Sequence, residues 1–340
     1  MLKKPFPLFN RAYNIYCLFL LLCSFGFTQA QMISAGLNES KNFNISFNPA
    51  FIRDTKISSL TKHITNKPDN QVIVDKGIIE HYEFNSKGLL SSMYTTEVKS
   101  TSERDIPSYT FGRHGKRIPY TKIEYSYLYD TTFVFYEYDE LNRLIIKRTS
   151  IIGREVFRSH YYEYDEKNNI KKETVIREVN VAENLADIKI GMQTVLSVES
   201  FAYESLAPTQ LKKKFLNDEG RVYKEGIIYS DSCGNVIEEA FDFTVTWLKE
   251  HNYYKYNDKH LLIEKKIGGN DGSSSLENYD YELDDAGTLN ELRIFKDGIK
   301  TNNISYLYDK TTKIVDSEVN RDFKNLSIGI IKYNYTYYSY

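Results

Sequence analysis

Cysteine, proline and net charge are all scarce in this sequence of 340 residues. It contains three cysteines and seven prolines, and its 44 basic residues almost balance 46 acidic ones. So little cysteine excludes a disulfide-dense scaffold, and so little proline excludes a collagen-like chain. A formal charge of −2 argues against a nucleic-acid-binding protein, which would carry a strongly basic surface. Hydrophobic residues make up 41 % of the chain, which is enough for a packed core.

Familiar catalytic motifs are missing as well. The sequence has no His-Glu-x-x-His, no Gly-x-Ser-x-Gly and no glycine-rich phosphate loop. Ser59 and Lys62 match Ser-x-x-Lys without the companion motifs of that family, and the six histidines lack ligand spacing. We therefore predict a non-enzymatic protein with no cofactor and no metal site.

A long hydrophobic run occurs only near the N-terminus. Lys3, Lys4 and Arg11 precede an apolar run over residues 15–27, and the sequence then reads Thr-Gln-Ala up to residue 30. This pattern predicts a signal peptide over residues 1–30, because the run is shorter than the ~20 residues of a membrane span. An uncleaved anchor and a lipoprotein attached at Cys23 remain alternatives, although Leu22 stands where a lipoprotein has a small residue.

Removal of residues 1–30 changes both the net charge and the number of cysteines. It leaves 44 − 3 = 41 basic residues against 46 acidic ones, a net charge of −5, and Cys233 as the one remaining cysteine. We therefore expect an exported protein without an intramolecular disulfide or a transmembrane span, located in the periplasm, on the outer surface or in the medium.

Tyrosine is abundant, with 29 copies, and many of them fall into a nine-residue repeat. The pattern is aromatic, any residue, aromatic, Asp or Asn, two polar residues, Gly or Asn, any residue, aliphatic. The first positions of two clear copies, 136 and 162, differ by 26 residues. Copies begin at Tyr82, Tyr136, Tyr162, Tyr254, Tyr281 and Tyr306, and two further turns without the aromatic pair begin at Asn217 and Asp231.

Each part of the pattern has a structural reason. The two aromatic residues share one face of a strand, and the residue between them points to water. Asp or Asn then starts a turn, and Gly or Asn takes the left-handed conformation that the turn requires. The fold prediction is therefore all-β, with consecutive antiparallel β-hairpins forming one extended twisted repeat sheet. Tyrosine suits such a half-solvated sheet, because its ring is apolar and its hydroxyl reaches water.

The unit resembles the YD repeat of RHS-type proteins over about residues 79–315. This resemblance implies a winding sheet of hairpins and an extracytoplasmic setting. Long arrays in that family enclose a toxin in a hollow shell. This chain is short and lacks both an Asp-Pro-x-Gly self-cleavage motif and a distinct effector domain after the repeats.

The segments outside the repeat are less regular. We expect an N-terminal linker or capping segment over residues 31–70 and a YD-like hairpin repeat domain over residues 71–340. Residues 100–119 are basic and contain two prolines, which favours an exposed loop or a binding loop. Residues 179–195 carry the one helix-like spacing of apolar residues and are a candidate short helix or insertion.

The leading functional prediction is an extracytoplasmic binding or scaffold protein, with a glycan or another surface macromolecule as its partner. Alternatives are an envelope protein that self-associates through open edge strands, a glycan-active hydrolase and a toxin-associated RHS fragment. An open aromatic face would indicate a binding surface, and a covered one would indicate core. The candidate ligand-stacking residues are Tyr82, Tyr136, Tyr138, Tyr162, Tyr164, Trp247, Tyr254, Tyr256, Tyr281, Tyr306 and Tyr308.

Overall fold

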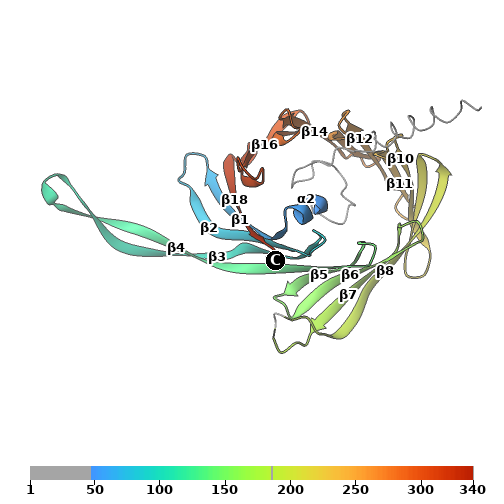
Figure 1. Cartoon of the computed structure of the whole chain (residues 1–340), viewed down its shortest axis with the longest axis horizontal. Helices are drawn as coiled ribbons and strands as arrows, with labels where there is room; N and C mark the ends of the chain where they lie inside the picture. The colour runs from blue at the N-terminus through green and yellow to red at the C-terminus, as the bar shows by residue number, and fades with distance from the viewer. Residues whose placement is uncertain (1–46, 185–186, 340) are drawn as a thin grey trace, which may run out of the picture.

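The computed structural model describes residues 47–184 and 187–339, and the expected signal peptide lies outside them. Figure 1 shows a ring of strands around one short helix, α2 (Pro49–Asp54), with a long hairpin projecting from it. A 3-10 turn, η1 (Arg113–Gly115), forms the tip of that hairpin. The strands are β1 (Ile57–Pro68), β2 (Val74–Phe84), β3 (Leu90–Phe111), β4 (Arg117–Tyr138), β5 (Leu144–Ile152), β6 (Val156–Tyr164), β7 (Ile170–Asn180), β8 (Ile190–Ala207), β9 (Gln210–Leu216), β10 (Val222–Ser230), β11 (Val236–Phe243), β12 (Lys249–Tyr256), β13 (Leu262–Gly269), β14 (Ser274–Leu283), β15 (Leu289–Lys296), β16 (Ile299–Tyr308), β17 (Val315–Asp322) and β18 (Ser327–Tyr337).

The sheet is closed, so the prediction of an open, extended repeat sheet is wrong. Each strand pairs antiparallel with its neighbour in sequence, and β18 returns to pair with β1, which also pairs with β2. The closing register runs from Ile57 opposite Tyr337 to Pro68 opposite Ser327. The all-β class and the consecutive antiparallel hairpins are confirmed, and the result is one 18-stranded sheet.

Residues 57–68, within the predicted linker or capping segment, form β1. Two other segments outside the repeat have a different structure from the one expected. Residues 100–119 are not a loop, because they form most of the outer half of the β3–β4 hairpin. The candidate helix over residues 179–195 is also wrong, since its ends belong to β7 and β8. The apolar spacing there covers the end of one strand and the start of the next, and residues 185–186 lie outside the described residues.

The repeat turns have the predicted conformation. Asn142 and Asn168 adopt positive φ angles of 63° and 65°. In six turns the carboxylate or amide oxygen at position four accepts the backbone N–H four residues later, at 2.7–3.0 Å. The turn at Asn217 has the same bond, 2.8 Å from the Arg221 nitrogen, but it joins β9 to β10 and so lies at the opposite end of the strands. Turn chemistry alone therefore does not identify a repeat unit.

Six tyrosine hydroxyl bonds each join a hairpin to the one before it. The tyrosine at position three of a unit donates to the carbonyl of the aliphatic residue that opens the return strand of the preceding unit. Tyr203 occupies this position on β8, which shows that the hairpin of β8 and β9 fills a place in the ring despite its different turn. The bonds are Tyr138 to Leu90 (2.9 Å), Tyr164 to Leu144 (2.8 Å), Tyr203 to Ile170 (3.0 Å), Tyr256 to Val236 (3.0 Å), Tyr308 to Leu289 (2.6 Å) and Tyr335 to Val315 (2.5 Å).

The core lies inside the ring, where α2 meets the repeat tyrosines. Asn48 caps α2 by accepting the backbone N–H groups of Ala50 and Phe51, and Ile52 of the helix is fully buried. Ile52 packs in one cluster with Leu60, Tyr136, Tyr162 and Tyr333. The tyrosine-rich faces of several hairpins thus share a single core with the helix.

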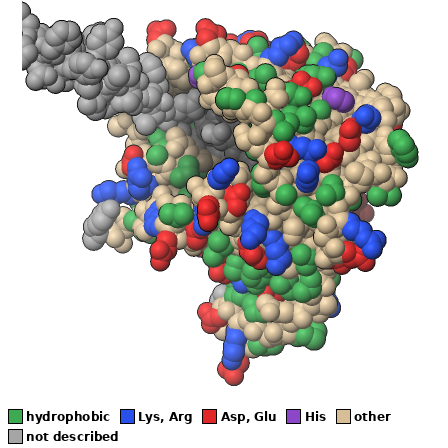
Figure 2. Space-filling model, turned by 90° about the vertical axis from the view of Figure 1, so that its right-hand side faces the viewer, with side chains coloured by type: hydrophobic (Ala, Val, Ile, Leu, Met, Phe, Trp, Pro, Cys, Tyr) green, Lys and Arg blue, Asp and Glu red, His purple; other side chains and the backbone are tan. Residues whose placement is uncertain are grey.

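The outer face is charged and faces water. The residue between the two aromatic positions is exposed in every clear copy of the repeat, as predicted. Ion pairs link neighbouring strands on this face, including Lys255 to Glu264 at 2.7 Å and Arg293 to Asp280 at 2.9 Å. Figure 2 shows acidic and basic side chains interspersed with hydrophobic ones on one side of the molecule.

Gly88, in the first repeat turn, should be essential for docking α2. It has φ +79°, and a Cβ there would lie 2.0 Å from the Pro49 carbonyl oxygen. Gly287 has nearly the same φ, +82°, with open space around it. We expect Gly88→Ala to lower the free energy of unfolding by about 2 kcal/mol or more, against about 1 kcal/mol for Gly287→Ala, which carries the backbone strain alone. Urea unfolding of the two variants measures the difference, and equal losses would show that the α2 contact contributes nothing.

Candidate binding groove

The predicted ligand-stacking tyrosines line the inside of the ring. Tyr136, Tyr162 and Tyr254 are buried, and the others retain partial exposure. Burial raises the pKa of Tyr136 to about 12, so its hydroxyl stays protonated in neutral solution. The core cluster brings together seven of the predicted tyrosines and does not include Tyr254, Tyr256 or Tyr281; the seven are Tyr82, Tyr136, Tyr138, Tyr162, Tyr164, Tyr306 and Tyr308. A ligand-stacking role for any of these residues stays a prediction.

Trp247 is separated from the tyrosines. It lies in the turn between β11 and β12, at the opposite end of the strands from the repeat turns, and 85 % of its surface is exposed. Its φ of 58° is in the left-handed region. The structure therefore does not unite the predicted aromatic strip into one continuous surface.

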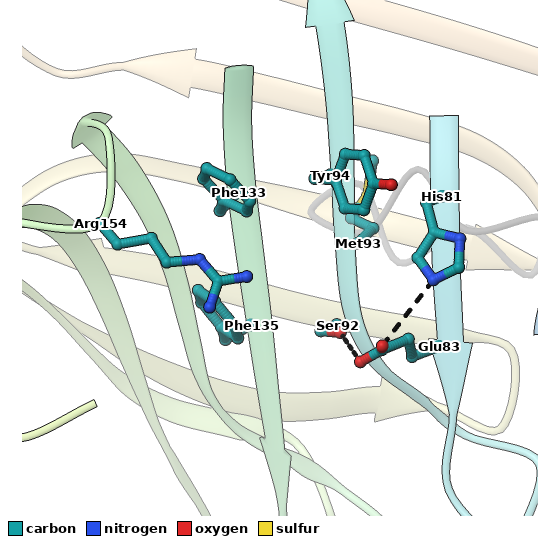
Figure 3. A pocket seen from close by; sticks show the side chains of 8 residues that line it. All are labelled: His81, Glu83, Ser92, Met93, Tyr94, Phe133, Phe135 and Arg154. Atoms are coloured by element: carbon teal, nitrogen blue, oxygen red, sulfur yellow. Dashed lines mark hydrogen bonds and ion pairs between the residues drawn. The ribbon is translucent and has the colours of Figure 1, made fainter. Parts of the chain in front are cut away.

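An open aromatic groove lies instead on the outer face of the sheet. It encloses about 300 Å³ and is lined from β2, β3, β4 and the turn between β5 and β6. Figure 3 shows its side chains facing one another across the strands. The lining residues are His81, Glu83, Ser92, Met93, Tyr94, Phe133, Phe135 and Arg154.

The polar end of the groove is formed by His81, Glu83 and Ser92. The Ser92 hydroxyl donates to Glu83 Oε2 at 2.5 Å, and His81 Nε2 lies 3.7 Å from Glu83 Oε1. The other ring nitrogen of His81 is 2.8 Å from the Thr61 hydroxyl. The His81 ring also stacks on Tyr94, with centroids 5.1 Å apart. These contacts hold a carboxylate and an imidazole side by side at the edge of an aromatic surface.

The aromatic end is formed by two phenylalanines under a guanidinium group. The Arg154 guanidinium lies 4.4 Å from the Phe133 ring centroid and 5.4 Å from that of Phe135. Phe135 in turn meets the fully buried Phe157 edge to face at 5.9 Å. Such cation–π and aromatic contacts hold the side chains in place.

A buried ion pair lies beside the aromatic end, on the same face of the sheet, since Phe135 pairs with Arg148 and Phe157 pairs with Glu178. Glu178 is fully buried and accepts hydrogen bonds from Arg148 Nε at 2.9 Å, Ser159 at 2.5 Å and Gln193 at 2.8 Å, and one from the Tyr161 hydroxyl. Burial alone would raise the pKa of Glu178, but these hydrogen bonds and the Arg148 charge outweigh it and hold the pKa below its ordinary value.

The groove combines features of a binding site. Its serine hydroxyl donates a hydrogen bond to the glutamate, which faces the histidine on the other side. In residues 47–184 and 187–339, no three His, Cys, Asp or Glu side chains are arranged to hold a metal ion. The same part of the chain contains no helix long and apolar enough to cross a membrane.

Sequence reasoning missed these residues because it followed the inward face of the repeat. Tyr94, Phe133 and Phe135 stand in the outward register, where the repeat has Glu or Lys. The run Phe133-Val134-Phe135-Tyr136 is apolar on both faces of its strand. That break in alternation was the available signal for an apolar outer surface.

Comparison with known proteins does not identify a family for this chain. No protein-family model and no curated protein matches the sequence. A porin-like protein from Bacteroides uniformis is similar in structure with a TM-score of 0.35 and 10 % identity, covering 83 % of this chain and 98 % of the other. A porin-like protein from Bacteroides vulgatus has a TM-score of 0.26 and 10 % identity, covering 60 % and 94 %. Likeness at this level carries no functional assignment.

Proposed function

We propose that this chain is an exported, non-enzymatic binding protein of the cell envelope or the medium, and that its outer-face groove binds a glycan. The observation that carries the proposal is the aromatic surface of Tyr94 and Phe133 between Glu83 and Arg154. Sugar rings have apolar C–H faces that pack on aromatic rings, and their hydroxyls bond to carboxylate and guanidinium groups. A concave site that presents aromatic rings beside a carboxylate and a guanidinium group suits such a ligand.

The outer face of the sheet supports a setting in water. The paired charges on the outer face, such as Arg293 with Glu291 at 2.6 Å, are stable in water and costly against lipid hydrocarbon. The predicted signal peptide supports export. The nine-residue unit is, in this proposal, a YD-type repeat that here builds a ring and not a long shell.

A glycan array probed with the purified chain, followed by calorimetry on the best hit, tests the proposal. Phe133→Ala removes the aromatic surface and should weaken binding about tenfold, the effect of one stacking contact. Phe323→Ala is the matched control, because Phe323 is exposed, lies far from the groove in sequence and also has an arginine 5.6 Å over its ring.

The control should bind as tightly as the parent chain. Absence of any bound glycan on the array would contradict the proposal. Equal affinities for Phe133→Ala and the parent would also contradict it, because the ligand would then occupy another surface.

A further inference from the structure

The β3–β4 hairpin projects from the ring as a two-stranded arm, defined here as residues 100–128. β2 pairs with β3 up to Thr95, and β5 pairs with β4 from Val134 onward. Beyond these points the two strands pair with each other alone in the described structure, so both edges of the arm are open. Figure 1 shows it extending well away from the rest of the molecule. An isolated ribbon of this kind buries little and is marginally stable without a partner.

The outer end of the arm is apolar on both faces. Tyr109 and Phe111 lie on one face, with a 5.6 Å edge-to-face contact, and 65 % of Phe111 is exposed. Ile118 and Tyr120 lie opposite Thr110 and Ser108, on the other face, and are about half exposed. A partner protein that docked on one face would leave the second apolar face in water. An environment that surrounds the outer end of the arm would cover both apolar faces.

The charged side chains at the outer end of the arm are all basic. Residues 106–123, called the tip from here on, contain Arg113, Lys116, Arg117 and Lys122 and no acidic residue. The rest of the chain then has 44 − 4 = 40 basic and 46 acidic residues, a net charge of −6. Acidic residues return at Asp105 and Glu124, just below the tip on both strands. An anionic surface would therefore attract the tip and repel the body.

We propose that the tip docks into the headgroup layer of an anionic lipid membrane. Exposed aromatic rings beside lysine and arginine are the side chains that favour this layer, and each basic residue adds attraction to anionic lipids. The open edges fix the depth, because unpaired backbone N–H and C=O groups cannot enter hydrocarbon without water. The arm then holds the ring above the membrane, with the outer groove at the base of the arm.

Flotation of the purified full chain with phosphatidylcholine vesicles, with and without phosphatidylglycerol, tests this proposal. We expect binding to the anionic vesicles, and its loss in the variant Arg113→Gln, Lys116→Gln, Arg117→Gln, Lys122→Gln. Each removed charge should lower the partition coefficient about fivefold. A matched control neutralises four exposed lysines of the ring, Lys259→Gln, Lys266→Gln, Lys310→Gln and Lys324→Gln, and should bind like the parent.

A second variant, Phe111→Ser with Tyr120→Ser, keeps all charges and should weaken vesicle binding at least tenfold, since both insert into the same layer. Circular dichroism establishes that each variant remains folded. Undiminished binding of the four-glutamine tip variant would overturn the proposal. So would equal binding of the parent to neutral vesicles, or binding to a soluble anionic polysaccharide without binding to vesicles. Glycan binding in the groove is independent of all these outcomes.

Discussion

Leu60→Asp should prevent the ring from closing. Leu60 is fully buried in β1, opposite Tyr335 of β18 on one side and Tyr82 of β2 on the other. A carboxylate there would lose its hydration without gaining a partner, which costs several kcal/mol, on the scale of the whole stability of a domain. We expect no cooperative thermal transition by circular dichroism.

Two companion variants make this result interpretable. Val72→Asp introduces the same charge at a 79 % exposed position in the turn that follows β1, and should change the free energy of unfolding by less than about 0.5 kcal/mol. Leu60→Ala should fold but lose about 2–5 kcal/mol, the usual cost of a core truncation. If Leu60→Asp melted near the parent temperature, β1 would not be the strand that closes the sheet.

Glu178→Ala should be nearly as damaging, because it leaves the buried Arg148 with less compensation. Removing one partner of a buried ion pair costs about 3–5 kcal/mol. Arg148 would still pair with Glu137. We therefore expect the loss in free energy of unfolding to lie at the lower end of that range. Urea unfolding measures it. Glu163→Ala is the control, since Glu163 is exposed and pairs with Lys172 at 3.0 Å on the surface, where the expected loss is below about 1 kcal/mol.

The same carboxylate should make stability depend on pH. The folded-state pKa of Glu178 lies below its ordinary value, so its contribution is present above the unfolded-state pKa of about 4.3 and is lost as pH falls through the folded value. The double variant Arg148→Met, Glu178→Leu removes both charges and should regain most of the stability. It should also lose less stability than the parent between neutral and acidic pH. A double variant as unstable as Glu178→Ala would show that packing, and not the unpaired charge, causes the loss.

Local features of the fold were predictable and the closure was not. The Asp139 turn is encoded within a few residues, because one side chain and one left-handed asparagine set the hairpin. The pairing of Ile57 with Tyr337 joins the two ends of the sheet and has no local pattern. The mixed sequence of residues 57–68 resembles a linker, since β1 alternates weakly between polar and apolar side chains.

The functional surfaces were harder still to predict. The aromatic residues were expected on one strip, but alternation along strands places the repeat tyrosines inside and Phe133 and Phe135 outside. Arg154 reaches the groove from a turn, and no motif marks such a residue. The basic character of residues 100–119 was visible in the sequence, but their role as a projecting ribbon depends on where β2 and β5 stop pairing.

Closure also sets the copy number of the repeat. In an open array another hairpin adds length at one end and disturbs only its neighbour. In a ring, two more strands would widen the circumference by about 10 Å and draw the walls away from α2 and Leu60. Because the six tyrosine bonds contact only the preceding hairpin, an extra unit could form its local contacts and still be incompatible with closure of the ring. Duplication or loss of a unit, which an open repeat protein tolerates, should therefore be selected against in this one.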